Sequence, residues 1–318
     1  MRILLTGGTG LIGRALCQHL QQQGHELWVW SRQPARVPGL CSGARGVAHL
    51  QELNAVGPFD AVINLAGAPI ADRPWTKSRR ALLWQSRIDL THKLVAWMAE
   101  QPTPPRVLLS ASAVGWYGDR ADACLDESSS PGGQDFGSRL CMAWEDEAQR
   151  AALAGTRVAL LRIAPVLASR GGMLARLLLP FKLGLGGRLG SGAQGRPWIH
   201  IEDLARLFPL AIASKRQRRL QRLRARVAAQ RGIYPHLSAY AAPPCANACA
   251  RLGAALGAGR NVHLALGRPT PRAAPHPSKR FCLSPPGPST GLGRLAKQTI
   301  NTRQAQGLCV NAGLQNRR

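Results

Sequence analysis

Short apolar runs alternate with longer amphipathic segments through the first two thirds of the chain. The runs have the length of buried strands, and the segments between them have the length and periodicity of helices. The expected strands are Arg2–Leu5, Glu26–Trp30, Ala61–Ala66, Arg106–Ser110 and Arg157–Ile163. The expected helices are Leu11–Gln23, Leu83–Ala99 and Phe136–Ala152. Strands that alternate with helices form parallel βαβ units, so the pattern predicts an α/β fold with a doubly wound parallel sheet.

The character of the chain changes near Phe208–Ser214. All eight tryptophans and all 16 acidic residues of the 318-residue chain lie before Phe208. Residues 1–203 carry 22 of the 42 Lys and Arg, a net charge of +6, so the formal +26 of the whole chain describes neither part. We therefore divide the chain into a folded domain, residues 1–208, and a basic tail, residues 209–318. We expect this low-acid tail to be degenerate or disordered.

Two interpretations of the tail remain open. We favour translation out of frame, by a frameshift or a sequence error, because residues 204–318 contain no acid where an average stretch would contain about 14. The alternative is a genuine basic arm. Lys215–Val227 could form a basic helix, with Leu220, Leu223 and Val227 on one side, that binds nucleic acid or anionic lipid. No aromatic residue lies within that run, which does not favour a nucleic-acid partner.

Cysteine usage and the apolar runs bear on the compartment. The eight cysteines include no Cys-x-x-Cys pair, which is typical of a reduced intracellular chain. Glycines interrupt Met1–Ile12, so this run does not read as a signal peptide. The most apolar later run, Met173–Leu185, contains Arg176, Pro180 and Lys182 and does not read as a membrane span. We expect a cytoplasmic protein with no membrane partner and no metal site.

A glycine-rich turn, TGGTGLIG, separates the first expected strand from the first helix. Gly7 permits a tight turn, Gly10 lets the backbone approach a pyrophosphate, and Gly13 lets the helix pack closely on the strand. The helix N-terminus offers amides and a positive dipole end to the anion. The turn therefore predicts a Rossmann-like dinucleotide site. Its expected cofactor contacts are Thr6, Gly7, Thr9, Gly10, Leu11, Ile12 and Gly13.

The end of the second expected strand indicates which dinucleotide is bound. An NAD site usually has an acid there for the ribose 2′-hydroxyl, but this strand is followed by Ser31 and Arg32, and no acid follows until Glu52. A guanidinium pairs with a phosphate, and a serine can add a hydrogen bond. We therefore predict NADP(H) rather than NAD(H), with Ser31 and Arg32 at the 2′-phosphate. Arg36 could share the role, and the alternative is that Arg32 is a solvated loop residue.

Six segments of the sequence, the first of which contains the glycine-rich turn, indicate a family resemblance: MRILLTGGTGLIG, DAVINLAGAPIADRPW, WQSRI, LLSASAVGWYGD, LLRIAPVLASRGGML and WIHIEDLA. With them the chain resembles an extended short-chain dehydrogenase/reductase. More narrowly, it resembles the group of epimerase family proteins described as nucleoside-diphosphate-sugar epimerases. The segments occur in the expected order from residue 1 to about residue 208, whereas the remainder shows no resemblance to the family's substrate lobe.

The resemblance implies roles for residues at two strand ends. Asn64, Leu65, Ala66 and Gly67 would lie beside the adenine and ribose of the cofactor. Ser112 would direct its hydroxyl at the nicotinamide and substrate as a catalytic residue. The alternative for Ser112 is a hydroxyl that only caps the strand end.

The chain departs from the family at the catalytic pair. Active members use Tyr-x-x-x-Lys, in which a lysine tunes the tyrosine that transfers the proton. The matching helix here has Phe136 and, four residues later, Leu140. Phenylalanine cannot transfer a proton. Tyr117, the only tyrosine in the first 203 residues, could replace it as the acid/base, although packing beside the site is the reading that we favour.

The expected function is NADP(H) binding in an epimerase-like or reductase-like protein with a small-molecule substrate, which could be a nucleotide sugar. A non-catalytic NADP(H)-binding sensor or scaffold is the alternative, because Phe136 stands at the tyrosine position. Between Glu147 and Glu202 the chain has basic residues and no acid, which would suit a substrate diphosphate or form a solvated basic face. We expect His200 to be a structural, hydrogen-bonding residue.

Overall fold

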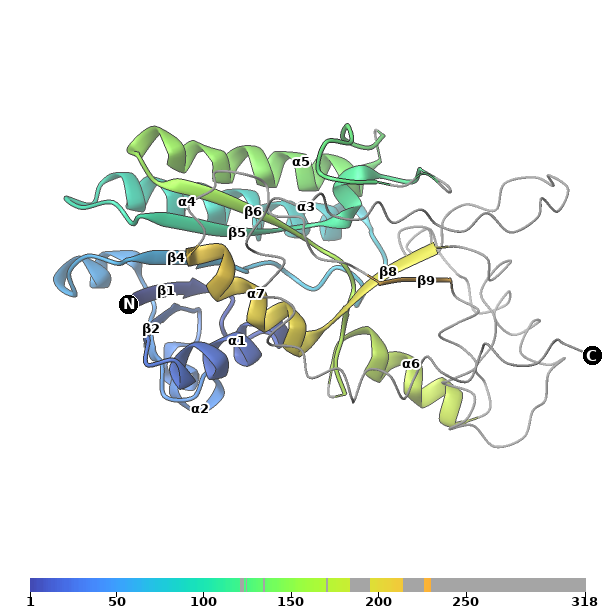
Figure 1. The fold of residues 1–318 in the computed structure, drawn as a ribbon, viewed down its shortest axis with the longest axis horizontal. Helices are drawn as coiled ribbons and strands as arrows, with labels where there is room; N and C mark the ends of the chain where they lie inside the picture. Colours follow the sequence, from blue (N-terminus) through green and yellow to red (C-terminus); the bar gives the residue numbers. More distant parts are fainter. Residues whose placement is uncertain are drawn as a thin grey trace, which may run out of the picture. The chain divides into compact units, whose positions relative to one another are not determined.

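The computed structural model of the chain describes residues 1–120, 123, 125–133, 135–169, 171–183, 195–213 and 226–229. Its centre is a six-stranded sheet (Figure 1) with the order β3-β2-β1-β4-β5-β6 and parallel pairing throughout. The strands are β1 (Arg2–Thr6), β2 (Glu26–Trp30), β3 (Arg45–Val47), β4 (Ala61–Asn64), β5 (Val107–Ala113) and β6 (Arg157–Ile163). The order runs outward from β1 on one side and from β4 on the other. The predicted α/β class and the doubly wound, Rossmann-like parallel sheet are thus confirmed.

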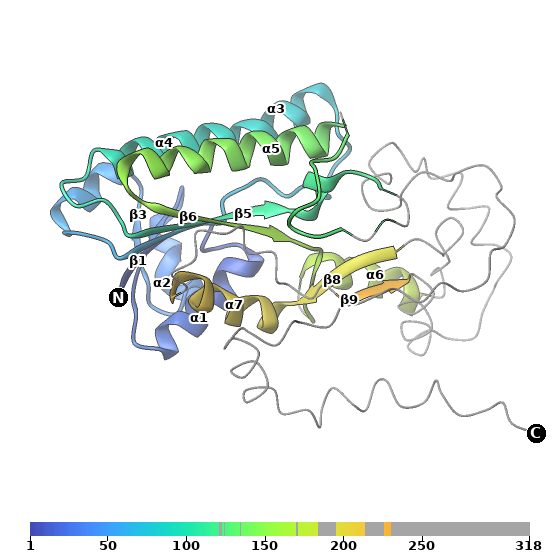
Figure 2. The same ribbon diagram turned by 45° about the horizontal axis from the view of Figure 1, so that its top comes forward.

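Helices cover both faces of this sheet (Figures 1 and 2). The longer ones are α1 (Leu11–Gln22), α4 (Ile88–Ala99), α5 (Phe136–Gln149) and α7 (Ile201–Ala213). Ile3 of β1 lies in one core cluster with Leu16 of α1 and Phe208 of α7. The next residue, Leu4, lies in a second cluster with Leu94 of α4. Successive strand residues point to opposite faces, so the continuous apolar runs of the sequence reflect a sheet that is buried on both sides.

The helix expected from Leu83 to Ala99 is two helices, α3 (Lys77–Gln85) and α4. The break falls at Ser86 and Arg87, whose side chains bind backbone groups of the loop after β4. Two other ends also differ from the expectation. Strand β5 continues to residue 113, and α5 ends at residue 149, where the short 3₁₀ turn η4 (Arg150–Ala154) follows.

Helix α7 crosses the position at which the sequence changes character. It runs past residue 208 to residue 213, and Phe208, Ala211 and Ile212 are buried. Arg157 donates from Nη2 to the carbonyls of Ala211 at 3.1 Å and Ile212 at 2.7 Å. These bonds satisfy carbonyls that the end of a helix leaves without partners. The core therefore includes residues as far as 212.

A second, smaller sheet follows the first in the chain. Its strands are β7 (Val166–Leu167), β8 (Gly195–His200) and β9 (Arg226–Ala229), and α6 (Gly172–Lys182) lies between β7 and β8 in sequence. Val227 pairs with Pro197 of β8 in an antiparallel ladder. The predicted basic helix is therefore wrong at its last two residues, because a neighbouring strand takes up that backbone. Residues 215–225 and the expectations for 230–318 lie outside the described residues. Within the described ranges, no helix is both long and apolar enough to span a membrane.

Candidate functional site

The turn between β1 and α1 has the shape of an anion-binding loop. Gly7 has a φ of +68°, and a Cβ there would lie 2.7 Å from the carbonyl of Leu65. A Cβ on Gly13 would lie 2.4 Å from the carbonyl oxygen of Gly7, so helix and strand approach closely. Gly10 begins α1 with no side-chain cap, which leaves the first amides of the helix to an anion. Half-buried side chains complete the turn, those of Thr9, Leu11 and Ile12.

Buried polar side chains fix the ends of β1 and β4. Thr6 Oγ1 accepts hydrogen bonds from the amides of Leu65 at 3.2 Å and Ala66 at 3.1 Å, and donates to Asn64 Oδ1 at 2.6 Å. Asn64 Nδ2 donates in turn to Thr91 Oγ1 on α4 at 2.8 Å. Thr6, Asn64 and Thr91 are at most 1% exposed. Buried polar groups without partners are costly, so these hydrogen bonds fix the backbone at the ends of β1 and β4.

Ser31 and Arg32 follow β2, whose last residue, Trp30, pairs with the last residue of β1. The Ser31 hydroxyl accepts a hydrogen bond from the amide of Gln33 at 3.1 Å. Arg36 donates to Gln33 Oε1 at 2.9 Å. Arg32 is exposed, and in the described part of the chain no hydrogen bond or ion pair engages its guanidinium. Arg32 can therefore meet an anion beside the glycine turn.

Ser112 and Tyr117 are joined through a buried ion pair. Ser112 Oγ donates to Glu145 Oε1 at 2.7 Å, and Arg162 Nη1 donates to the Tyr117 hydroxyl at 3.0 Å. Arg162 binds Glu145 with Nε and Nη2, and its Cζ lies 3.3 Å from the centroid of the Trp116 ring. Ser112, Tyr117, Glu145 and Arg162 are at most 3% exposed. The structure thus brings the two catalytic candidates into one cluster.

The ring of Phe136, at the start of α5, contacts an aromatic and a cationic side chain. The Trp75 ring lies edge-on to it with 5.2 Å between centroids, and Arg80 Cζ lies 5.5 Å from its centroid. Leu140 is 1% exposed. Asp135 accepts a hydrogen bond from the amide of Ser138 at 3.0 Å and so caps the helix. The start of α5 therefore supplies packing and a cap at the position where the resemblance implies a proton donor.

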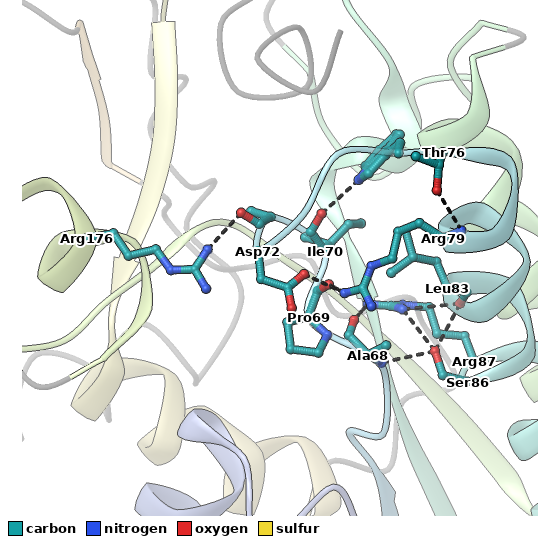
Figure 3. A network of polar contacts seen from close by, with 12 residues as sticks. Ala68, Pro69, Ile70, Asp72, Thr76, Arg79, Leu83, Ser86, Arg87 and Arg176 are labelled. Carbon is teal, nitrogen blue, oxygen red and sulfur yellow. Dashed lines mark hydrogen bonds and ion pairs between the residues drawn. The ribbon is translucent and has the colours of Figure 1, made fainter. Parts of the chain in front are cut away.

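The loop after β4 is held by the dipeptide at the break between α3 and α4 (Figure 3). Ser86 Oγ accepts a hydrogen bond from the amide of Ala68 at 3.0 Å, and Arg87 Nη2 donates to the carbonyl of Ala68 at 3.0 Å. A Cβ on Gly67 would lie 2.9 Å from Arg87 Cζ. One dipeptide, Ser86-Arg87, thus binds both the amide and the carbonyl of Ala68.

Two further arginines bind the same loop (Figure 3). Arg79 donates to the carbonyl of Pro69 and pairs with the Asp72 carboxylate. Arg176 reaches from α6 and donates to the carbonyl of Ala71 at 2.7 Å. The loop is therefore tied to the helices on both sides.

The comparisons with known proteins agree with this geometry. Residues 3–222 match the family described as NAD dependent epimerase/dehydratase. The chain belongs to the NAD-dependent epimerase/dehydratase family. It is 40% identical over 216 residues to the epimerase family protein SDR39U1 of Mus musculus. The matched region covers 67% of this chain and 70% of that protein. It is 39% identical over 212 residues to the epimerase family protein MT2273 of Mycobacterium tuberculosis, over 66% of this chain and 69% of that protein.

Solved structures of this epimerase/dehydratase family are similar as well. The human epimerase family protein SDR39U1 (isoform 2), crystallised with NADPH, has a TM-score of 0.59 at 37% identity and covers 67% of this chain and 70% of that chain. A nucleoside-diphosphate sugar epimerase from Corynebacterium glutamicum has a TM-score of 0.62 at 29% identity, over 82% of this chain and 55% of that chain. The resemblance inferred from the six segments is confirmed.

Sequence reasoning missed two pairs of residues at the candidate site of this epimerase/dehydratase family member, Glu145 with Arg162 and Ser86 with Arg87. A signal existed for Arg162, because a charge inside the buried strand RVALLRI must have a partner. Ser86 and Arg87 stand in the WQSRI segment, but only the fold shows that they bind the loop. His200 accepts a hydrogen bond from the amide of Glu202 at 3.4 Å. No group of three or more His, Cys, Asp or Glu within the described ranges could hold a metal ion.

Proposed function

We propose that the protein binds NADP(H) and acts on a small molecule as an epimerase-like or reductase-like enzyme. Arg32 is the residue that favours NADP(H) over NAD(H). Its exposed guanidinium follows β2, beside the glycine turn, where an acid would favour the 2′-hydroxyl of NAD. An arginine with a neighbouring serine suits a 2′-phosphate instead. The human relative, 37% identical and crystallised with NADPH, supports this choice.

The residues of the turn fit a dinucleotide. Backbone atoms fill the space that a Cβ at Gly7 or Gly13 would need, and the first turn of α1 carries no acid that would repel a phosphate. The residues that would hold the pyrophosphate are Thr6, Gly7, Thr9, Gly10, Leu11, Ile12 and Gly13. Those on the ribose side would be Asn64, Leu65, Ala66 and Gly67. When bound, the cofactor would supply hydride-transfer chemistry.

Ser112 and Tyr117 are the candidates for catalysis. Because Ser112 gives its proton to Glu145, its oxygen can accept a hydrogen bond from a substrate hydroxyl. Tyr117 accepts a hydrogen bond from Arg162, so a positive group polarises its hydroxyl. A nucleotide sugar is the proposed substrate class, supported by the 29% identical relative named as a nucleoside-diphosphate sugar epimerase.

A second candidate function is a non-catalytic NADP(H)-binding sensor or scaffold. The observation that favours it is the packing of Phe136 against Trp75 and Arg80, which leaves a side chain with no proton to transfer at the start of α5. Ser112 and Tyr117 are moreover at most 3% exposed. A protein of this kind would keep the dinucleotide site intact and show no turnover.

Titration of the protein with NADPH and with NADH, followed by calorimetry, tests the cofactor. We expect tighter binding of NADPH and a loss of roughly ten- to hundredfold in its affinity with Arg32→Glu, with little effect on NADH. Arg106→Glu is the matched control, because this exposed arginine precedes β5 at the opposite end of the sheet. A wild-type protein that binds neither dinucleotide, or prefers NADH, contradicts the proposal.

Turnover then separates the enzyme from the sensor. NADPH oxidation and NADP⁺ reduction are measured over a panel of nucleotide sugars and simple carbonyl compounds. In an enzyme, Ser112→Ala and Tyr117→Phe lower the rate and leave NADPH affinity unchanged. Tight NADPH binding without turnover on any member of the panel favours the sensor or scaffold.

A further inference from the structure

Arg87 is a buried cation at the start of α4, with 9% of its surface exposed. Its guanidinium donates to the carbonyls of Leu83 at 3.2 Å and Ala68 at 3.0 Å. Its Cζ also lies 5.3 Å from the centroid of the Trp144 ring. These partners are dipoles and a π face, and none of them carries a negative charge. Burial lowers the pKa of Arg87 to about 10, so the group is still protonated near neutral pH.

The described part of the protein does not balance this charge. No carboxylate there forms an ion pair with Arg87, and Asp89, in the first turn of α4, is exposed. Cys141 interacts with Arg87 electrostatically, but burial raises the pKa of its thiol to about 11 and keeps it neutral. Arg79 is bound to Asp72 and still repels Arg87. The dipole of α4 adds further positive potential at this end of the helix.

The guanidinium lies against the backbone of the expected cofactor crevice. A Cβ on Gly67 would lie 2.9 Å from Arg87 Cζ, and Gly67 directly follows the stretch, Leu65 and Ala66, that contacts Gly7. Figure 3 shows Arg87 beside Ala68 of this loop. Loop residues 65–68 therefore separate the glycine turn from an unbalanced positive charge.

We propose that Arg87 provides a positive charge which the phosphates of a bound dinucleotide balance, so that it acts on cofactor affinity through its field. The proposal rests on NADP(H) binding as the function. A charge inside the protein is poorly screened by salt and acts over several ångströms. Loop backbone intervenes, so Arg87 is a positioning residue and makes no contact with the ligand. The bound anion offsets the unfavourable burial of the cation.

A purely structural role for Arg87 makes a different prediction. Arg87 and Ser86 together hold the peptide groups of Ala68, and this grip needs the planar fork of the guanidinium. Lysine keeps the charge and loses the fork, whereas methionine loses both. The two substitutions therefore separate the charge of Arg87 from its grip on the loop.

The first experiment measures NADPH affinity by calorimetry in the wild type, Arg87→Lys, Arg87→Met and the control Arg106→Met. We expect Arg87→Met to weaken binding by about tenfold or more, with Arg87→Lys within about threefold of the wild type. Arg106→Met, which removes an exposed charge from the opposite end of the sheet, should have no effect. An equal loss in Arg87→Lys and Arg87→Met overturns the proposal in favour of a structural grip. Unchanged affinity in Arg87→Met overturns it as well.

A second pair of variants does not depend on how well Arg87→Met folds. Cys141→Asp places a carboxylate in the field of Arg87, and Cys141→Asn is its neutral isostere. We expect Cys141→Asp to bind NADPH about tenfold more weakly than Cys141→Asn, because the new anion balances Arg87 within the protein. Equal affinities overturn the role of Arg87 while the proposed function stands. A folded wild type that binds no NADPH instead overturns the proposed function, and this proposal with it.

Discussion

Arg162 and Glu145 form a two-point ion pair inside the protein, with 2.7 Å between Nε and Oε1 and 2.8 Å between Nη2 and Oε2. Burial alone would lower the pKa of Arg162, but the hydrogen bonds to Glu145 and Tyr117 raise it above its ordinary value. The pair connects β6 to α5, and Ser112 adds the end of β5. Three elements of the candidate catalytic region are thus held by one carboxylate.

Glu145→Ala should destabilise the protein by about 3–5 kcal/mol, because it leaves the Arg162 charge buried without a partner. Replacing both members, Glu145→Leu with Arg162→Met, should recover most of that loss. Urea unfolding measures both effects. Glu147→Ala is the matched control on the same helix. Glu147 pairs with the exposed His92 and Arg150, so its loss should cost less than about 1 kcal/mol. Equal losses in the free energy of unfolding for Glu145→Ala and Glu147→Ala would show that the buried pair matters no more than an exposed one.

Phe136→Tyr should not create a proton donor. The ring packs against Trp75 and Arg80, and Leu140, which stands four residues later where the resemblance implies the lysine of the catalytic pair, is buried and apolar. We expect unchanged NADPH affinity and no gain in NADPH oxidation over the same panel of carbonyl compounds. Phe136→Leu controls for loss of the aromatic packing. A rise in turnover of tenfold or more, specific to Phe136→Tyr, would show that substrate reaches this position.

The sheet and the glycine turn could be predicted because their signals are local. A strand buried on both faces is a continuous apolar run, and the turn needs glycine at Gly7 and Gly13 for reasons of backbone space alone. Segment WQSRI predicts a continuing helix. Nothing in the local sequence distinguishes a serine that hydrogen-bonds a loop far away in the sequence from a serine on a helix surface. That break depends on Ala68, which is 18 residues away from Ser86.

The environment of the candidate catalytic residues could not be predicted in the same way. The segment LLSASAVGWYGD makes Ser112 a candidate, but its partner Glu145 is 33 residues away in the sequence and Arg162 is a further 17. The parallel pairing of β5 with β6 sets Ser112 opposite Arg162, and Glu145 reaches both from α5. Side-chain pairing across a sheet follows from register, and the sequence of one strand does not contain the register of its neighbour.

Cys141 should make the stability of the protein depend on pH in the alkaline range. Burial raises the pKa of its thiol from 9.0 to about 11, so above pH 9 the unfolded chain releases a proton that the native protein keeps. The neutral thiol contributes on the order of 3 kcal/mol to the free energy of unfolding. This contribution is fully present below about pH 9 and is lost as the pH rises to about 11. Cys141→Ala should remove this contribution, so the gap between the two proteins in urea unfolding should change between pH 8 and pH 10.5. A constant gap would contradict a buried neutral thiol.

The acid-free tail leads to the last prediction, which concerns the gene. Helix α7 packs Phe208, Ala211 and Ile212 into the core, and Arg157 binds its final carbonyls, so the reading frame is native at least through residue 212. The family match runs on to residue 222, so a change of frame falls near these codons. The mouse relative is matched over 70% of its length, so a segment of it lies outside the match. We expect translation of the DNA beyond codon 212 in one of the other two frames to give a sequence with about 12% Asp and Glu that resembles this segment. Sequencing of the gene across codons 205–225 checks for an inserted or deleted base. If neither alternative frame yields such a sequence, the tail is a genuine part of the protein. The basic run that begins at Lys215 is then favoured as a binding site for an anionic partner.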